Sequence, residues 1–306
     1  LSDFTLPPGF SMSIFAQNVP DARVMVWGPK GVMFVSETSE GKVVALPDTN
    51  SDGKADEVRV VIENLDSPHG LAFKCQSEKL CDLYVAEKSA LSVFSYDAET
   101  GNAVKTEKLL DLPGGIVGTH FTRTLLFLGS PDEDTLLISA GSSCNVCFEE
   151  DARRAKILFY HIRTRESGDY AKGLRNSVFL ELHPVTGKVW ATEMGRDGLG
   201  DDIPPDELNI IEKGKHYGWP ICYGKNIHDT NFDKNTYIRN PCMEPMETPS
   251  LVDFPAHSAP LGLSFIPEEG WAEEYWHNAL VAYHGSWNRS VPTGYKIVRV
   301  KLDERG

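Results

Sequence analysis

Short apolar runs recur along the whole chain, and Gly, Pro, Asp and Asn separate them. The apolar positions seldom follow the three- and four-residue spacing of an amphipathic helix, so the pattern predicts an all-β chain. Five runs have the form of a buried strand: 33–37, 83–87, 136–140, 189–193 and 280–284. A second apolar run precedes each of them, at 24–26, 70–73, 124–127, 178–182 and 262–265, and we expect each pair to form a hairpin.

The spacing of these hairpins is regular. The first four longer runs end at Glu37, Glu87, Ala140 and Glu193, which lie 50, 53 and 53 residues apart. A period near 50 predicts one four-stranded sheet per repeat, because radial repetition of such sheets is how a β-propeller limits its exposed edges. The next step, to His284, is 91 residues, and we assign the excess to a loop excursion over 222–255.

The pattern therefore predicts a single propeller domain over 1–306 of the six-bladed type, with its sixth blade incomplete. The inner hairpins are expected near 22–37, 69–87, 120–140, 176–193 and 257–284. The fifth repeat ends in a third strand at 295–302, and a strand at 10–15 is expected to contribute to a sixth blade. Either the chain is a fragment or closure occurs differently, and a missing blade leaves two sheet edges open.

Composition narrows the class of protein. The 306 residues include 30 Lys and Arg against 44 Asp and Glu, a formal charge of −14, and 41% are hydrophobic. This is typical of a globular protein, and no apolar run approaches the roughly 20 residues of a membrane helix. The acidity argues against nucleic acid or anionic lipid as a partner, because both need a basic surface. A small or neutral ligand fits better.

Six cysteines allow three short loops, Cys75 with Cys81, Cys144 with Cys147 and Cys222 with Cys242, among 15 pairings. The C-x-x-C at 144–147 is compatible with a redox pair or half a zinc site, but no second C-x-x-C follows it. Structural disulfides are the favoured interpretation, and they indicate a periplasmic or extracellular protein. The start at Leu1, without a signal-type segment, is what a processed export product would show.

In a propeller, the starts of the inner strands and the ends of the second strands share one rim. The strand starts contribute His69, His120, Arg175, Asn176 and His257; the strand ends contribute Glu37, Glu87, Lys88, Glu193, Gly195, Arg196, His284, Trp287, Asn288 and Arg289. One such histidine alone is more often a hydrogen-bonded surface residue than a catalyst. Four histidines gathered at one mouth favour an active site.

Several multi-residue motifs of this chain together resemble those of a known protein family. They lie at 118–123 (GTHFTR), 173–176 (GLRN), 192–197 (TEMGRD) with 205–209 (PDELN), 217–220 (YGWP) and 284–290 (HGSWNRS). From about Leu6 to its last residue the chain resembles the pyrroloquinoline quinone (PQQ) dependent sugar dehydrogenases, and within them the L-sorbosone dehydrogenase-like branch. The resemblance implies a six-bladed propeller that binds PQQ and calcium.

The resemblance also implies roles for particular residues. His120 matches the general base that takes a proton from a sugar hydroxyl while a hydride passes to the quinone. The matching cofactor contacts are Arg123, Arg175, Asn176, Asn288 and Arg289. The matching calcium ligands are main-chain oxygens of Gly195 and Arg196, and Asp206 and Glu207, with Tyr217 nearby, match a structural calcium site or loop-pinning carboxylates. The plainer interpretation of 206–209 is a strand entry with an acidic turn.

Two departures stand out. Glucose-oxidising relatives carry an Asp after a Gly, where it orients the base; this chain has Gly141, Ser142 and Ser143. His120 must find another orienting group, or be a weaker base. Arg196 stands where those relatives have Pro, so its charge would lie beside the cation.

A second acidic loop, 48–56, resembles the first nine positions of a calcium loop with Gly53 at position six. Position twelve is Arg59 rather than Glu. An Asx-rich hairpin turn is therefore favoured, with weak calcium binding as the alternative.

Three functions compete. The first is a PQQ- and calcium-dependent oxidoreductase that acts on an aldose or a related aldehyde or sugar alcohol and passes electrons to an external acceptor. The second is a calcium-dependent lactonase-like propeller with a ring formed by Glu37, Glu87 and Glu193. The third is a cofactor-less propeller that binds carbohydrate or protein.

Overall fold

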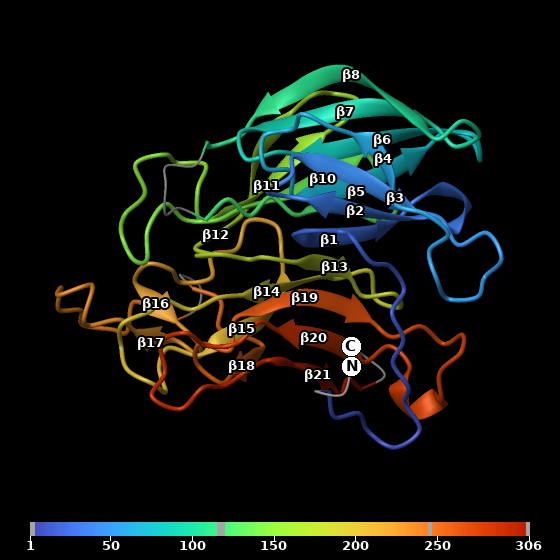
Figure 1. The fold of residues 1–306 in the computed structure, drawn as a ribbon. Coiled ribbons are helices and arrows are strands. Elements are labelled where there is room, and N and C mark those ends of the chain that lie inside the picture. The colour runs from blue at the N-terminus through green and yellow to red at the C-terminus, as the bar shows by residue number, and fades with distance from the viewer. Residues whose placement is uncertain (1–3, 115–119, 244–246, 304–306) are drawn as a thin grey trace. The chain divides into compact units, whose positions relative to one another are not determined.

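A computed structural model describes residues 4–114, 120–243 and 247–303 (Figure 1). Its contacts group into two compact units, with the division between Asp111 and Leu112. Both units consist of antiparallel sheets in which each strand pairs with the next one in sequence, except that β15 (Asp206–Ile211) pairs with β18 (Val252–Phe254), and β16 (Cys222–Tyr223) and β17 (Ile227–His228) form a separate hairpin between them. The only helical elements among the described residues are two short 3-10 turns, Pro29–Gly31 and Glu273–Tyr275.

The unit formed by residues 1–111 contains two four-stranded sheets. The strands of the first are β1 (Ala22–Trp27), β2 (Met33–Glu37), β3 (Lys42–Leu46) and β4 (Arg59–Ile62). Those of the second are β5 (Gly70–Cys75), β6 (Leu80–Ala86), β7 (Ala90–Asp97) and β8 (Asn102–Asp111). Phe34, Val43, Leu71, Leu83 and Phe94 pack between the two sheets, so each sheet buries a face that it could not bury alone.

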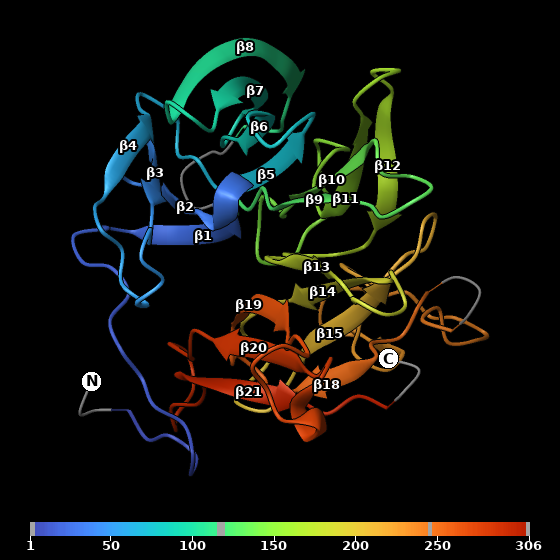
Figure 2. The ribbon, with the colours of Figure 1, turned by 90° about the vertical axis from the view of Figure 1, so that its right-hand side faces the viewer.

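The unit formed by residues 112–306 contains three sheets of three or four strands, besides one two-stranded hairpin. Figure 2 shows them from a second side. The first consists of β9 (Leu125–Phe127), β10 (Thr135–Ala140), β11 (Lys156–His161) and β12 (Ser167–Lys172). The second consists of β13 (Leu180–Leu182), β14 (Val189–Glu193), β15 (Asp206–Ile211) and β18 (Val252–Phe254). The third consists of β19 (Pro260–Phe265), β20 (Ala279–Tyr283) and β21 (Lys296–Val300).

Two apolar clusters join these sheets. Leu137 and Ile157 pack with Val189 and Ile211 between the first and second sheets. Trp190, which is fully buried, packs with Leu263 and Val281 between the second and third. Burial of a side chain of this size contributes about 1.5–3 kcal/mol, so these clusters fix the strand ends that carry the candidate site.

The excursion leaves the second sheet after β15 and returns as β18. It contains the small hairpin of β16 (Cys222–Tyr223) and β17 (Ile227–His228). A disulfide between Cys222 and Cys242 closes it. The other disulfides are Cys75–Cys81 and Cys144–Cys147, so the three short loops that the spacing allowed are the ones that form.

The predicted fold class is confirmed: the chain is all-β and of the incomplete six-bladed propeller type, with five blades among the described residues. The expected strand at 10–15 is wrong. No residue of this segment belongs to a strand, although the Phe15 carbonyl accepts from the Ala55 amide at 2.8 Å, and Phe10, Met12 and Ile14 remain substantially exposed. In the third sheet of residues 112–306, β21 is the outermost described strand.

The loop 48–56 is held by its own carboxylates. Asp48 accepts hydrogen bonds from the amides of Asp52 and Gly53, and Asp56 accepts them from the amide and hydroxyl of Thr49. These contacts are those of an Asx-rich turn.

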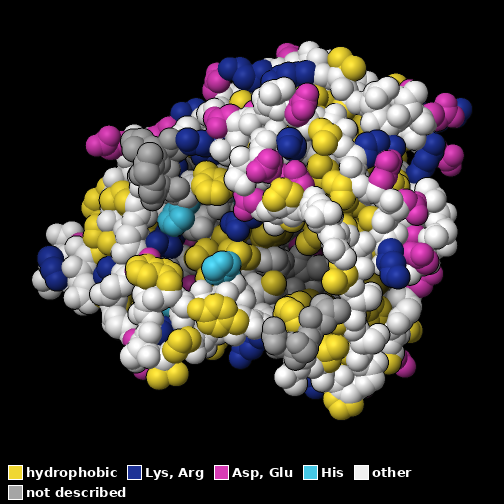
Figure 3. Space-filling model, viewed as in Figure 1, with side chains coloured by type: hydrophobic (Ala, Val, Ile, Leu, Met, Phe, Trp, Pro, Cys, Tyr) yellow, Lys and Arg dark blue, Asp and Glu magenta, His cyan; other side chains and the backbone are white. Residues whose placement is uncertain are grey.

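The face drawn in Figure 3 intersperses Lys and Arg with Asp and Glu, so the net negative charge forms no continuous patch there. Across the described part of the chain, no helix has the length and apolar character needed to cross a membrane.

Candidate active site

His120 lies just before β9, and its ring is held from one side. Its amide donates to the carbonyl of Ser142, and its Nδ1 lies 2.9 Å from the Ser142 hydroxyl. The same hydroxyl donates to the carbonyl of Cys144 at 2.6 Å. The ring is therefore anchored at Nδ1, while no described residue bonds to Nε2.

The surroundings of His120 are positively charged. Burial, followed by the charge of Arg175, lowers the pKa of His120 to about 3; a hydrogen bond with the Ser142 backbone opposes this shift, and the charge of Arg154 adds a smaller lowering. The imidazole is therefore neutral at physiological pH. A neutral imidazole is the form that can accept a proton.

Arg175 is the third residue of the GLRN segment and is almost fully buried. Its guanidinium donates to the carbonyl and side-chain oxygens of Asn145 at 2.9 and 3.0 Å and to the carbonyl of Met194 at 3.3 Å. It also lies 3.5 Å from a carboxylate oxygen of Asp197. One Nη1 hydrogen remains without a partner among the described residues, so a bidentate ligand would have to displace one of these contacts.

Asp197, to which the sequence analysis gave no role, is where several predicted residues meet. Its carboxylate accepts a hydrogen bond from Asn288 Nδ2 at 2.7 Å and lies 3.8 Å from His257 Nδ1. Its backbone makes two hydrogen bonds with the Asn145 side chain. Its only signal in the sequence was its position at the end of the TEMGRD motif.

Two buried amide oxygens in this region lack partners among the described residues: Asn176 Oδ1 and Asn288 Oδ1. Gly141 lies against the first of them. A Cβ at Gly141 would fall 2.6 Å from Asn176 Oδ1 and 2.5 Å from His120 Cβ, so any side chain there would force these neighbours apart. Unpartnered buried acceptors are costly, and their presence suits a site that takes a ligand or cation.

The carbonyl oxygens of Gly195 and Arg196 accept no hydrogen bond from the described residues. Two free main-chain oxygens on consecutive residues suit a hard cation such as calcium. The Arg196 guanidinium turns to Asp229 of the excursion, with which it makes a buried two-point ion pair at 2.5 and 2.9 Å. The charge expected beside the cation is therefore balanced.

The structure does not bring Asp206, Glu207 and Tyr217 together. Asp206 accepts from the amides of Gly195 and Ala259, and Glu207 accepts from the amide of Gly224 and from Asn209. The Tyr217 hydroxyl instead donates to the carbonyl of Ile210, at the far end of β15. Both carboxylates pin backbone, which agrees with the loop-pinning interpretation.

Glu193 has a similar role. It is buried and accepts from the Asn176 amide and the Ser177 hydroxyl, so it fixes the segment that carries Arg175. Burial raises the pKa of Glu193 to about 8, that of Glu207 to about 7 and that of Asp206 to about 6. These groups bind protons far more readily than ordinary carboxyls.

Arg123 and Arg289, both predicted cofactor contacts, are directed at backbone carbonyls. Arg123 is fully buried and donates to the carbonyls of Thr122 and Pro113; burial, followed by the charge of Arg154, lowers its pKa to about 9. Arg289 donates to the carbonyls of Asp201, Ala256 and Val291. Arg154, to which no role was assigned from the sequence, donates to the carbonyls of Gly141 and Gly114 and, at 3.4 Å, to that of His120.

The remaining rim residues divide between the two units. His257 is buried with Nε2 bonded to the carbonyl of Gly200, and His284 and Trp287 are exposed. His69, Glu37, Glu87 and Lys88 belong to residues 1–111. There, Glu87 accepts from the amide of Asp66, so its carboxylate is engaged within its own sheet.

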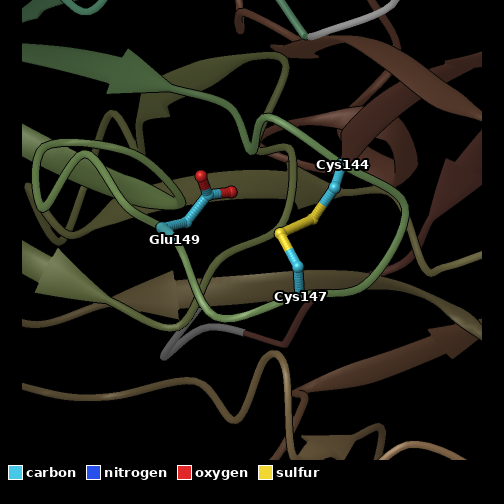
Figure 4. A group of neighbouring side chains, drawn as sticks. All are labelled: Cys144, Cys147 and Glu149. Carbon is cyan, nitrogen blue, oxygen red and sulfur yellow. A yellow bond between two sulfur atoms is a disulfide. The ribbon is translucent and has the colours of Figure 1, made fainter.

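Cys144, Cys147 and Glu149 are, within residues 4–114, 120–243 and 247–303, the one group of three such donors close enough to hold a metal ion (Figure 4). The two sulfur atoms are joined in a disulfide, and Glu149 accepts from the amide and hydroxyl of Ser143. In the disulfide form the thiolates that a metal requires are absent, so the group acts as a clamp on the loop.

Two polar depressions have no lining residue in common with the site around His120. One, of about 360 Å³, is bounded by residues that include Thr38 and Asp66; the other, of about 330 Å³, is bounded by residues that include His183 and Trp276. Neither includes any predicted site residue.

Comparison with known proteins gives a family and several relatives. A family model described as TrAA12-like matches residues 4–306. An uncharacterized protein of Borreliella burgdorferi is 38% identical over 319 residues, covering 99% of this chain and 78% of that protein. A pyrroloquinoline quinone-dependent sugar dehydrogenase of Hypocrea jecorina is 28% identical over 184 residues, covering 51% and 41%.

Two solved structures share the fold. A Trichoderma reesei protein of the carbohydrate-active enzyme family AA12 superposes with a TM-score of 0.79 at 23% identity, covering 97% of this chain and 82% of that chain. The PQQ domain of pyranose dehydrogenase from Coprinopsis cinerea, in its holo form, gives 0.73 at 20% identity, covering 93% and 76%.

Proposed function

Because the chain belongs to the TrAA12-like family, we propose that it is a PQQ- and calcium-dependent dehydrogenase with His120 as its general base. Its substrate class is an aldose or a related aldehyde or sugar alcohol, and its electrons pass to an external acceptor. The observation that carries the proposal is a neutral histidine in the same region as a buried arginine, with Nε2 and two amide oxygens that bond to none of the described residues. Three disulfides support a place outside the cytoplasm.

The residues present suit the two cofactors. Arg175, Asn176 and Asn288 would hold PQQ, since a buried cation and amide groups can pair with a polycarboxylate quinone. Gly195 and Arg196 would give calcium their main-chain oxygens. When bound, PQQ supplies a two-electron acceptor, and calcium polarises its quinone oxygens.

The protein's own part of the chemistry is proton transfer. His120 Nε2 accepts the proton of the substrate hydroxyl as the carbon that bears it loses a hydride. Arg175 and Arg154 disfavour the imidazolium that results, and an anionic ligand beside them would offset their charge. We therefore expect cofactor binding to raise the pKa of His120, which strengthens the base only when the acceptor is in place.

Reconstitution tests the proposal. The protein is mixed with PQQ and calcium, and cofactor absorbance and dye reduction are followed with a panel of aldoses and with L-sorbosone, which the motif resemblance favours. His120→Ala should abolish turnover and leave PQQ uptake largely intact. The matched control is His161→Ala, at the end of β11, which should behave as the wild type. Failure of the wild type to take up PQQ would exclude the proposal.

The same experiment also tests the two competing functions, a lactonase and a cofactor-less binding propeller. Lactone hydrolysis with calcium alone would support a lactonase, although the structure commits Glu87 and Glu193 to backbone amides. Sugar binding without PQQ uptake would support a carbohydrate-binding propeller.

A further inference from the structure

The hydroxyl of Ser142 lies between two groups that together determine its orientation. It is fully buried, 2.9 Å from His120 Nδ1 and 2.6 Å from the carbonyl oxygen of Cys144. A carbonyl oxygen can only accept a hydrogen bond, and a serine hydroxyl carries one proton. That proton therefore goes to Cys144, and the oxygen presents a lone pair to His120.

This arrangement determines the tautomer of the histidine. Nδ1 must carry the hydrogen if it is to bond with Ser142, and in a neutral imidazole the other nitrogen is then unprotonated. Nε2, to which no described residue bonds, thus holds the lone pair that a base needs.

We propose that Ser142 is a positioning residue that holds His120 in the Nδ1–H tautomer, in place of the carboxylate that the sequence analysis found missing. Its place in the mechanism rests on the function proposed above; the tautomer itself does not.

The surrounding loop holds Ser142 in turn. The Ser142 amide donates to the Arg175 carbonyl at 2.7 Å, and its carbonyl accepts from the His120 amide at 3.1 Å. The disulfide and Glu149 close the loop that supplies the Cys144 carbonyl (Figure 4). Asn145, within that loop, bonds to both Arg175 and Asp197, so the acceptor for the serine proton is fixed on two sides.

A serine differs from an aspartate in one measurable way. Both accept a hydrogen bond from Nδ1–H, but only the carboxylate adds a negative charge that stabilises imidazolium. Ser142→Asp should therefore keep the tautomer and raise the pKa of His120. Ser142→Ala removes the hydroxyl without adding charge, so His120 should no longer be restricted to the Nδ1–H tautomer.

The test uses the full chain without cofactor. Histidine ring nitrogens are labelled with ¹⁵N, and long-range ¹H–¹⁵N spectra are recorded across pH; His120→Gln identifies its signals among the nine histidines. The wild type should show Nδ1–H at neutral pH, Ser142→Ala a mixture, and Ser142→Asp the Nδ1–H form with a raised pKa. An Nε2–H form in the wild type would overturn the proposal, even if every variant failed to fold. So would an unchanged tautomer in a folded Ser142→Ala.

Activity gives a second readout. With PQQ and calcium bound, Ser142→Ala should lower kcat by a factor on the order of 10² to 10⁴, because loss of the correct tautomer has a cost of this size in a catalytic triad. KM and PQQ uptake should stay within about twofold of the wild type. A wild type that shows Nδ1–H but takes up no PQQ would contradict the proposed function and leave the role of Ser142 in holding the ring intact. A folded Ser142→Ala with wild-type kcat would overturn its role as a positioning residue.

Discussion

Glu193 should make the stability of the protein depend on pH in an unusual direction. Its carboxyl is buried at the end of β14 and has a pKa of about 8, against a reference value of 4.5. The folded state therefore binds this proton more tightly than the unfolded state. The contribution is complete below pH 4.5 and is lost as the pH rises toward and through 8.

The size of the effect follows from the two pKa values. Linkage gives a loss of about 1 kcal/mol between pH 7 and 8 from this group, and about 3 to 4 kcal/mol between pH 5 and 8. Glu207 and Asp206 act in the same direction but titrate lower, at about 7 and 6, so most of the loss above pH 7 belongs to Glu193.

Urea unfolding at pH 5, 6, 7 and 8, followed by tryptophan fluorescence, measures this loss. Glu193→Gln removes the titrating group and keeps an oxygen for the Asn176 amide, so most of the fall between pH 7 and 8 should disappear. The matched control is Glu99→Gln, on the exposed turn between β7 and β8, which should keep the wild-type slope. A Glu193→Gln protein that loses as much stability above pH 7 as the wild type would refute the reasoning.

Two further changes probe the packing of the site. Gly141→Ala places a Cβ 2.5 Å from that of His120, so we expect a loss of about 1–3 kcal/mol in unfolding free energy and at least about tenfold in dye reduction; wild-type turnover would contradict this. Arg196→Met leaves the buried Asp229 carboxylate unpaired and should cost about 3–5 kcal/mol in urea unfolding. Arg153→Met, which breaks an exposed ion pair, should cost at most about 1 kcal/mol, and equal losses in the two proteins would contradict the role of burial.

The strands could be predicted because their signals are local. The runs at 33–37 and 189–193 are β2 and β14 to the residue, since each is a short apolar run, buried almost throughout, between turn residues. The segment 10–15 alternates apolar and polar residues as a half-buried strand would, but it forms no strand, because pairing depends on a partner that its own sequence does not specify.

The site was predictable only in part, for a related reason. Motifs pointed to His120 and Arg175, and the structure brings both to the loop after β10. Asn145, Arg154 and Asp197 have their roles through contacts with residues that lie tens of positions away in the sequence. The loops that carry them have no periodic pattern from which those contacts could be predicted. The roles of Asp206 and Glu207 likewise depended on which backbone amides would face them.

An acidic residue ends several of the repeated strands, and the repeats differ in what stands at this position. Glu87 and Glu193 each bond to an amide in the segment that leads into their own sheet's first strand. The corresponding residue after β10 is Ala140, and the residues that follow it hold His120 instead. The acid at this position is therefore dispensable to the fold of a repeat, and where Ala140 replaces it, the loop that follows holds a side chain of the neighbouring segment as well as its backbone amide.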